Sequence, residues 1–251
     1  MIRVILISFL FLFSMTEFSY SQMSGLWTVS DTSYAEYGIE DNRFPCIASS
    51  GEESVVLLAN KYIFLPHYLK RSTDKGHTWE KIFTPANSYE LLSVANPSKN
   101  VIVITGDTTI YQGSLNQSSV YKKFGFITVS EDGGKTWNPT VFDSNCTIIC
   151  LSMYDSQNGI AVKRQVSNMY YTVDYKYDTL LVTNDCWKSY KKVILPDNIV
   201  YSRMSFCFSN KIFYIINYNK SIQKFYLYKT FDGGDNWEEI EFPYNVTSVT
   251  F

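Results

Sequence analysis

The chain has 251 residues, with 22 Lys and Arg against 24 Asp and Glu, and a formal net charge of −2. A charge near zero without a basic stripe excludes the electrostatic footprint of a nucleic-acid-binding protein. Aromatic residues make up 17% of the chain and include 20 tyrosines, a composition that suits β-sheets and exposed recognition surfaces.

The first 21 residues have the pattern of an export signal. A basic start at residues 1–3 precedes an unbroken apolar run at residues 4–13, and residues 19–21 (SYS) form a small-x-small cleavage site. This apolar run is too short to span a bilayer as a stable helix. We expect a signal peptide over 1–21 and a mature chain over 22–251 that has no membrane span and is secreted, periplasmic or on the cell surface. An uncleaved N-terminal anchor is the alternative.

The mature chain then repeats one order of short strand segments four times. Each segment is rich in β-branched and aromatic residues and is bounded by turn residues, and none has a 3.6-residue period. The four sets are FPCIAS, SVVLLA, YLKRS and WEKIF; YELLSVA, VIVITG, GFITVS and WNPTVF; TIICLSM, GIAVKR, TLLVT and YKKVIL; and RMSFCF, IFYIIN, FYLYKT and WEEIEF. The sequence therefore predicts an all-β fold.

An eight-residue motif precedes the last strand of each set. Its copies are STDKGHTW (72–79), SEDGGKTW (130–137), TNDCWKSY (183–190) and TFDGGDNW (230–237). The copies recur about every 50 residues, which is the period of a four-stranded propeller blade.

The motif has the chemistry of a hairpin turn. Glycine can take a positive φ without a Cβ penalty, and the Ser or Thr and Asp oxygens can accept hydrogen bonds from turn amides. The final aromatic side chain buries a large area. Because the third copy has Trp187 where glycine is expected, we expect its turn to be irregular. The residues with this structural role are Ser72, Asp74, Gly76, Trp79, Ser130, Asp132, Gly134, Trp137, Thr183, Asp185, Tyr190, Thr230, Asp232, Gly234 and Trp237.

These motifs resemble the Asp-box, or BNR, repeat, and the resemblance covers about residues 24–251. Proteins with this repeat include sialidases, sortilin-type receptors, some glycan-degrading enzymes and photosystem-assembly-factor-like propellers. The resemblance implies a β-propeller of four-stranded antiparallel blades in which the box is a structural turn away from the ligand site. The expected blades are 28–79, 80–137, 138–190 and 191–237, with a partial unit over 238–251.

The two ends of this repeat pattern do not complete each other. Trp27 lies in a segment that matches a fourth strand, and residues 244–251 match a first strand. We therefore expect about four complete blades plus a stub, in an open arc or a poorly closed ring, from a truncated chain of a longer protein.

An exo-sialidase-type glycoside hydrolase is the alternative function. The segment Arg43-Phe44-Pro45 resembles the Arg-x-Pro element of sialidases, which also need two further arginines, a Tyr–Glu pair and an Asp acid/base. The mature chain has four arginines, and convergence of Arg43 with Arg164 and Arg203 would favour the enzyme. No nucleophile elbow, phosphate loop or HExxH pattern is present, so no catalytic residue is assigned.

The leading prediction is a secreted, non-catalytic recognition or scaffolding propeller. Aromatic residues gather between the second and third strands of each set, where they could stack on sugar rings or dock a protein. The alternative is that these tyrosines merely lengthen the two strands into tall hairpins. The candidate residues for binding an unknown glycan or protein are Tyr68, Tyr111, Tyr170, Tyr171, Tyr175, Tyr177 and Arg43.

The cysteines do not form a disulfide framework. They are odd in number and irregularly spaced, at positions 46, 146, 150, 186 and 207. With only two histidines in the chain, a zinc site is not expected either. We predict small buried cysteine side chains, no metal site and no cofactor.

Overall fold

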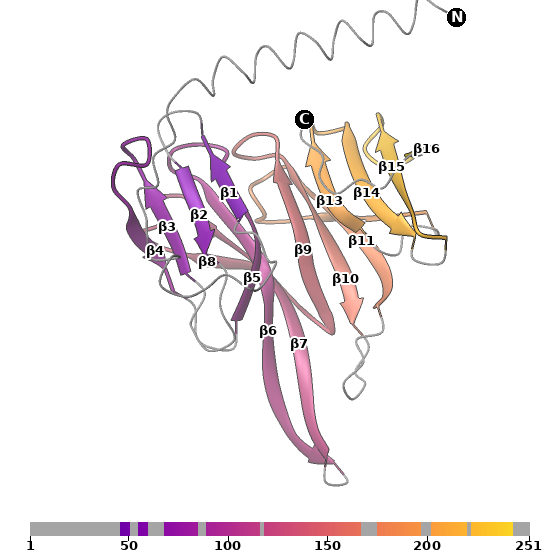
Figure 1. Cartoon of the computed structure of the whole chain (residues 1–251), viewed down its shortest axis with the longest axis horizontal. Coiled ribbons are helices and arrows are strands. Elements are labelled where there is room, and N and C mark those ends of the chain that lie inside the picture. Colours follow the sequence, from indigo (N-terminus) through magenta and orange to yellow (C-terminus); the bar gives the residue numbers. More distant parts are fainter. Residues whose placement is uncertain are drawn as a thin grey trace, which may run out of the picture. The chain divides into compact units, whose positions relative to one another are not determined.

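The structure is a computed structural model that describes residues 46–50, 55–59, 68–84, 89–115, 118–166, 175–196, 202–219 and 222–242. The described residues form sixteen strands in four sheets (Figure 1). Each sheet has four antiparallel strands, and in every sheet the strands are neighbours in chain order. The prediction of an all-β fold with four-stranded antiparallel sheets is confirmed. The predicted signal peptide and Trp27 lie outside the described residues.

The first two sheets match the first two predicted sets of strands. The strands of sheet 1 are β1 (Cys46–Ser49), β2 (Val55–Ala59), β3 (Tyr68–Ser72) and β4 (Glu80–Phe83). Those of sheet 2 are β5 (Tyr89–Ala95), β6 (Ile102–Leu115), β7 (Ser118–Ser130) and β8 (Asn138–Ser144).

The remaining two sheets follow the same order. The strands of sheet 3 are β9 (Cys146–Met153), β10 (Gly159–Val166), β11 (Tyr175–Thr183) and β12 (Lys191–Ile194). Those of sheet 4 are β13 (Ser202–Cys207), β14 (Phe213–Asn219), β15 (Lys224–Thr230) and β16 (Glu238–Glu241).

The strand that follows each box belongs to the same sheet as the strand before it. For example, β4 pairs with β3, with Arg71 opposite Glu80, and β16 pairs with β15. The sheets therefore run from β1 to β4, β5 to β8, β9 to β12 and β13 to β16. The expected repeat boundaries at residues 79, 137, 190 and 237 fall between the third and fourth strands of a sheet, because the box turn joins those strands.

Consecutive sheets pack on each other through their first strands. Strand β5 contacts β1 and β2, strand β9 contacts β5, β6 and β7, and strand β13 contacts β9 and β10. Ile102, Val103 and Ile104 of β6 are all fully buried, because both faces of a middle strand are covered. This explains why the second strand of each set reads as a continuous apolar run and not as an alternation.

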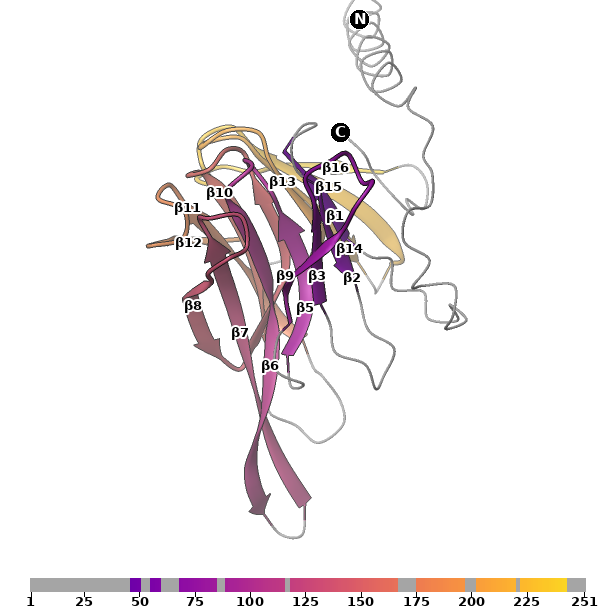
Figure 2. The same cartoon turned by 90° about the vertical axis from the view of Figure 1, so that its left-hand side faces the viewer.

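Sheet 2 differs from the others in the length of its middle strands. The outer strands end at the pairs Tyr89–Thr108 (β5 with β6) and Phe124–Ser144 (β7 with β8). Past these pairs, β6 and β7 continue to pair with each other as far as Leu115 and Ser118. Figures 1 and 2 both show this hairpin extending past the other strands. The alternative of a tall hairpin is thus what the structure has in sheet 2.

Four of the cysteines have buried side chains. Cys146, Cys150, Cys186 and Cys207 form no disulfide with one another. Burial raises the pKa of both Cys186 and Cys207 to about 11, so these thiols stay protonated near neutral pH. None of the residues that the structure describes forms a helix with the length and apolarity needed to cross a membrane.

Candidate functional site

The four boxes form one kind of turn, held by the hydroxyl of their first residue. In the second box, Ser130 Oγ accepts a hydrogen bond from Gly134 N at 2.7 Å and donates one to Asp132 Oδ1 at 2.8 Å. Gly76 N donates in the same way to Ser72 Oγ, Trp187 N to Thr183 Oγ1 and Gly234 N to Thr230 Oγ1.

The box aspartates complete these turns. Thr78 donates to Asp74 from its backbone amide and its hydroxyl, and these bonds hold the pKa of Asp74 at about 2. Hydrogen bonds from the residue four positions later likewise lower the pKa of Asp132, Asp185 and Asp232. Each box carboxylate is therefore an anionic acceptor for its own turn.

The prediction that the third turn would be irregular is wrong. Cys186 and Trp187 take positive φ values of 58° and 64°, as Gly133 and Gly134 do at 75° and 97°. Ser189 donates to Asp185 from both its amide, at 2.9 Å, and its hydroxyl, at 2.6 Å. The Trp187 side chain is fully buried in the core formed by sheets 2 and 3, and its Nε1 donates to Met153 Sδ at 3.2 Å. Burial of the indole offsets the strain of the left-handed backbone.

The described arginine guanidinium groups tie neighbouring sheets together. Arg71 is buried and donates to Gly133 O at 2.7 Å and to Lys99 O at 2.6 Å, which joins sheet 1 to sheet 2. Arg164 donates to both carboxylate oxygens of Asp178, at 2.8 and 2.9 Å. The same Asp178 accepts from Ser202 N, and Arg164 donates to Ser202 O, which joins sheet 3 to sheet 4.

These contacts bear on the sialidase alternative. A sialidase arginine must be able to bind the substrate carboxylate, whereas Arg164 already binds the carboxylate of Asp178. Arg43 and the side chain of Arg203 lie outside the described residues, so their convergence with Arg164 stays untested.

A buried carboxylate joins sheets 2 and 3. Asp107 of β6 accepts a hydrogen bond from Thr147 Oγ1 of β9 at 2.7 Å, and Lys123 Nζ lies 3.0 Å from its Oδ2. Burial raises the pKa of Asp107, and Lys123 opposes this shift. The sequence did not reveal this contact; its one signal is an Asp directly after the apolar run VIVITG.

The predicted binding residues are only partly described. Tyr68 is half-buried at the start of β3, with Lys70 Nζ and Lys81 Nζ at 5.5 and 4.7 Å from its ring centre. Tyr111 is 54% exposed on the tall hairpin. Tyr175 and Tyr177 lie on β11, but their side chains are not described, and Tyr170, Tyr171 and Arg43 lie outside the described residues. Their role in binding stays a prediction.

The structure has a cavity of about 930 Å³ where the first strands of sheets 1, 2 and 3 end. It lies at the end of the sheets that carries the boxes. In sheet 2, Gly133 N of the box donates to Asn100 O of the turn between β5 and β6; in sheet 3, Cys186 N donates to Gln157 O of the corresponding turn. The cavity residues are Ala48, Ser49, Ser50, Val94, Ala95, Asn96, Pro97, Ser98, Lys99, Leu151, Ser152, Met153 and Tyr154.

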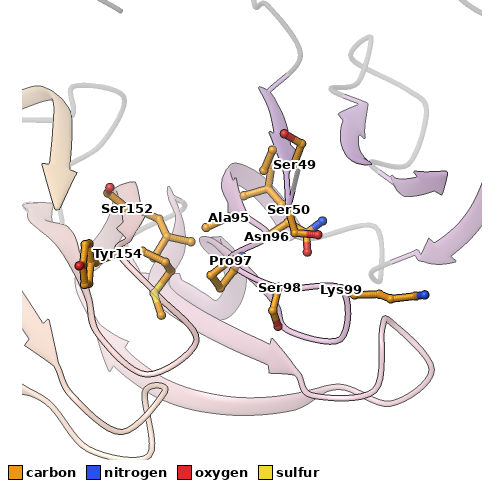
Figure 3. Close-up of a pocket in the computed structure, with 13 residues that line it drawn as sticks. Ser49, Ser50, Ala95, Asn96, Pro97, Ser98, Lys99, Ser152 and Tyr154 are labelled. Carbon is orange, nitrogen blue, oxygen red and sulfur yellow. The ribbon is translucent and has the colours of Figure 1, made fainter. Parts of the chain in front are cut away.

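Polar groups face this cavity from two sides. Figure 3 shows Ser152 and Tyr154 on one side and Ser50, Asn96 and Ser98 on the other. Tyr68 and Tyr111, the two predicted binding residues whose side chains the structure describes, do not line the cavity. The sequence signal for the cavity is the Ser- and Asn-rich composition of the segments between first and second strands, such as ANPSKN.

No protein-family model matches the chain, and no curated protein does. Several solved structures are similar in part. "YCF48 bound to D1 peptide" is 16% identical with a TM-score of 0.41 and covers 61% of this chain and 41% of its own. The GH74 xyloglucanase from Xanthomonas campestris is 10% identical with a TM-score of 0.45, and the match covers 78% of this chain and 38% of the xyloglucanase. The Hadza microbial sialidase Hz136 is 12% identical with a TM-score of 0.47, and the match covers 78% of this chain and 44% of the sialidase. The chain thus spans about two fifths of the length of these proteins.

Proposed function

We propose that this chain is an exported Asp-box β-propeller that recognises a glycan or a protein and catalyses no reaction. Support for the propeller comes from four successive four-stranded antiparallel sheets, in which sheets 2, 3 and 4 each pack their first strand on the preceding sheet. Four box turns with the same hydrogen bonds support the Asp-box repeat. Export rests on the signal pattern of residues 1–21.

One observation carries the non-catalytic part of the proposal. The described residues that line the cavity supply serine hydroxyls, an amide, a lysine and a tyrosine, and none of these described residues is Asp, Glu, His, Cys or Arg. Glycoside hydrolysis usually needs a pair of carboxyl groups on either side of the scissile bond. The described lining can therefore hold a polar ligand by hydrogen bonds, and it contains no carboxyl pair that would cleave one.

Several other carboxylates of the described chain are already engaged in structural hydrogen bonds. The box carboxylates are held by their own turns, and Asp178 is held by Arg164. Among the residues that the structure describes, no group of three or more His, Cys, Asp and Glu side chains is arranged to hold a metal ion.

The proposal is tested by measuring turnover and binding on the same protein. We expect the purified full chain to leave a fluorogenic sialoside and other aryl glycosides uncleaved, and to bind saturably to members of a glycan array. Hydrolysis of the sialoside that is abolished in Arg43→Ala would contradict the proposal and establish the sialidase alternative. Hydrolysis that persists in Arg43→Ala and co-purifies unevenly with the protein would identify a contaminating enzyme and leave the proposal standing.

A further inference from the structure

The walls of the cavity at the box end are fixed by hydrogen bonds to the neighbouring sheets. Arg71 holds Lys99 O, and Ser152 Oγ accepts a hydrogen bond from Cys207 N of sheet 4 at 3.0 Å. Ser98 accepts two bonds from Val101 N, one to its carbonyl and one to its hydroxyl. A site with walls that are set before the ligand arrives loses little entropy on binding.

The lining combines small hydroxyl groups with an exposed aromatic ring. Tyr154 is 55% exposed, and it is next to Ser152 and Met153 in the wall formed by sheet 3. Asn96 is buried in the opposite wall beside the half-buried Ser50 and Ser98. Within the described part of the chain, the buried Ser50 Oγ makes no hydrogen bond.

The lining is also close to neutral. Among the described lining residues Lys99 is the one cation, and Figure 3 shows its side chain extending away from Tyr154. Asp155, next to Tyr154 in the chain, is occupied by hydrogen bonds from Asn158 and Gln157. Between the two polar walls, a ligand with a formal charge would find no partner of opposite charge among the described side chains other than Lys99.

A sugar ring matches this chemistry better than a charged or extended apolar ligand does. A pyranose has hydroxyl groups around its edge, which hydrogen-bond to Ser and Asn, and a C–H face that packs on an aromatic ring. The volume of about 930 Å³ is at the upper end of the roughly 300–1,000 Å³ of small-molecule sites, so it admits more than one ring.

We propose that this cavity binds a neutral saccharide, with one sugar ring against Tyr154 and its hydroxyls on Ser98 and Ser152. This inference rests on the proposed recognition function and places the site at the box end of the sheets. Tyr111, one of the tyrosines predicted from the sequence to bind, lies on the hairpin between the second and third strands of sheet 2, at the opposite end.

Calorimetric titration of the full chain with linear neutral oligosaccharides of glucose, xylose and mannose tests this proposal. We expect at least one of these sugars to bind, and Tyr154→Ala to weaken that binding by about tenfold or more, because the ring is lost from the site. Tyr154→Phe keeps the ring and should keep most of the affinity.

Phe208→Ala is the matched control. Phe208 follows β13 as Tyr154 follows β9, and each donates its amide to the carbonyl four residues later. Its ring packs on Tyr214 at 4.9 Å and does not line the cavity. The control variant should bind the sugar as the unchanged chain does.

Three results would overturn the inference while the recognition function stands. One is binding that is lost in Tyr111→Ala and kept in Tyr154→Ala, which would place the site on the opposite end. The second is binding of sialylated or uronic acid sugars alone. The third is a glycan array or peptide titration that shows saturable binding while every neutral oligosaccharide fails to bind. Turnover of a glycoside that depends on Arg43 is the separate result that would refute the proposed function itself.

Discussion

The second and third box turns have the same hydrogen bonds but different residues at their left-handed positions. Gly133 and Gly134 occupy these positions in one turn, and Cys186 and Trp187 occupy them in the other. A left-handed backbone costs a residue with a Cβ roughly 1–2 kcal/mol. The hydroxyl and carboxylate of the box are common to both turns, so they, and not the glycine, specify the turn. Glycine only lowers the conformational free energy that the left-handed backbone of the turn costs.

The second left-handed position faces side chains of the preceding sheet in both turns. A Cβ on Gly134 would lie 2.8 Å from Ile82 Cδ1, whereas the Trp187 indole fills a core of sheets 2 and 3. The comparison teaches that this position is a packing position, where the neighbouring sheet decides which residue fits. Four experiments test that conclusion.

The largest effect is expected from Trp187→Gly. This variant restores the box consensus but empties a fully buried site. Loss of a buried aromatic side chain costs about 3–5 kcal/mol, and relief of the left-handed strain returns only about 1 kcal/mol. Chemical denaturation should therefore show a clear net loss in the free energy of unfolding. Equal or greater stability would mean that the turn conformation outweighs packing.

Removal of the box hydroxyl should have the next largest effect, and the same one in both turns. Ser130 and Thr183 are buried, and each accepts a hydrogen bond from the amide four residues later. Ser130→Ala and Thr183→Val leave that amide without its acceptor, which costs about 1–3 kcal/mol. Denaturation of the two variants measures both values. If Thr183→Val left the free energy of unfolding unchanged while Ser130→Ala lowered it, Trp187 alone would be what stabilises the third turn.

Alanine at the glycine positions separates backbone strain from packing. Gly233 has a φ of 81° and open space around its missing Cβ, so Gly233→Ala should cost about 1 kcal/mol from the backbone alone. Gly134→Ala should cost more, because its Cβ also meets Ile82. Thermal melting of the two variants gives the order. If the two costs were equal, the contact with Ile82 would be irrelevant.

Acidification should produce the smallest change per residue, since the box carboxylates are exposed and their interactions are screened. The pKa of Asp74 is lowered to about 2, below the roughly 3.9 of an unfolded Asp. Its stabilising contribution is complete above that unfolded value and is lost as the pH falls toward the folded one. Melting temperatures should fall between about pH 4 and pH 2, and Asp74→Asn should make that fall shallower. An unchanged slope would contradict the assigned hydrogen bonds.

The strands and the turns were predictable because they are local. The segments YELLSVA and TIICLSM carry β-branched and aromatic residues between turn residues, and the structure has strands there as β5 and β9. The hydrogen bonds of each box join residues that are two or four positions apart. Sequence spacing alone is sufficient to specify such contacts.

The contacts between sheets could not be predicted, because they join residues that are far apart in the chain. Nothing in the sequence pairs Asp107 with Thr147 or Arg71 with Gly133. The irregular third turn was wrongly predicted for the same reason, because the core that receives Trp187 comes from other strands. The cavity could not be predicted from the sequence, because its walls belong to three different sheets.

The polar ties between sheets have a consequence for the order of the repeats. An arginine of sheet 1 donates hydrogen bonds to two backbone carbonyls of sheet 2. A threonine of sheet 3 donates a hydrogen bond to a carboxylate of sheet 2. The Arg–Asp ion pair of sheet 3 forms hydrogen bonds with the backbone at the start of a strand of sheet 4. Because each tie differs, exchanging two repeats would bury a charge without its partner, which is far more costly than losing an exposed one. The four repeats share one type of turn, but they are not interchangeable. The polar contacts between neighbouring sheets determine the order of the sheets.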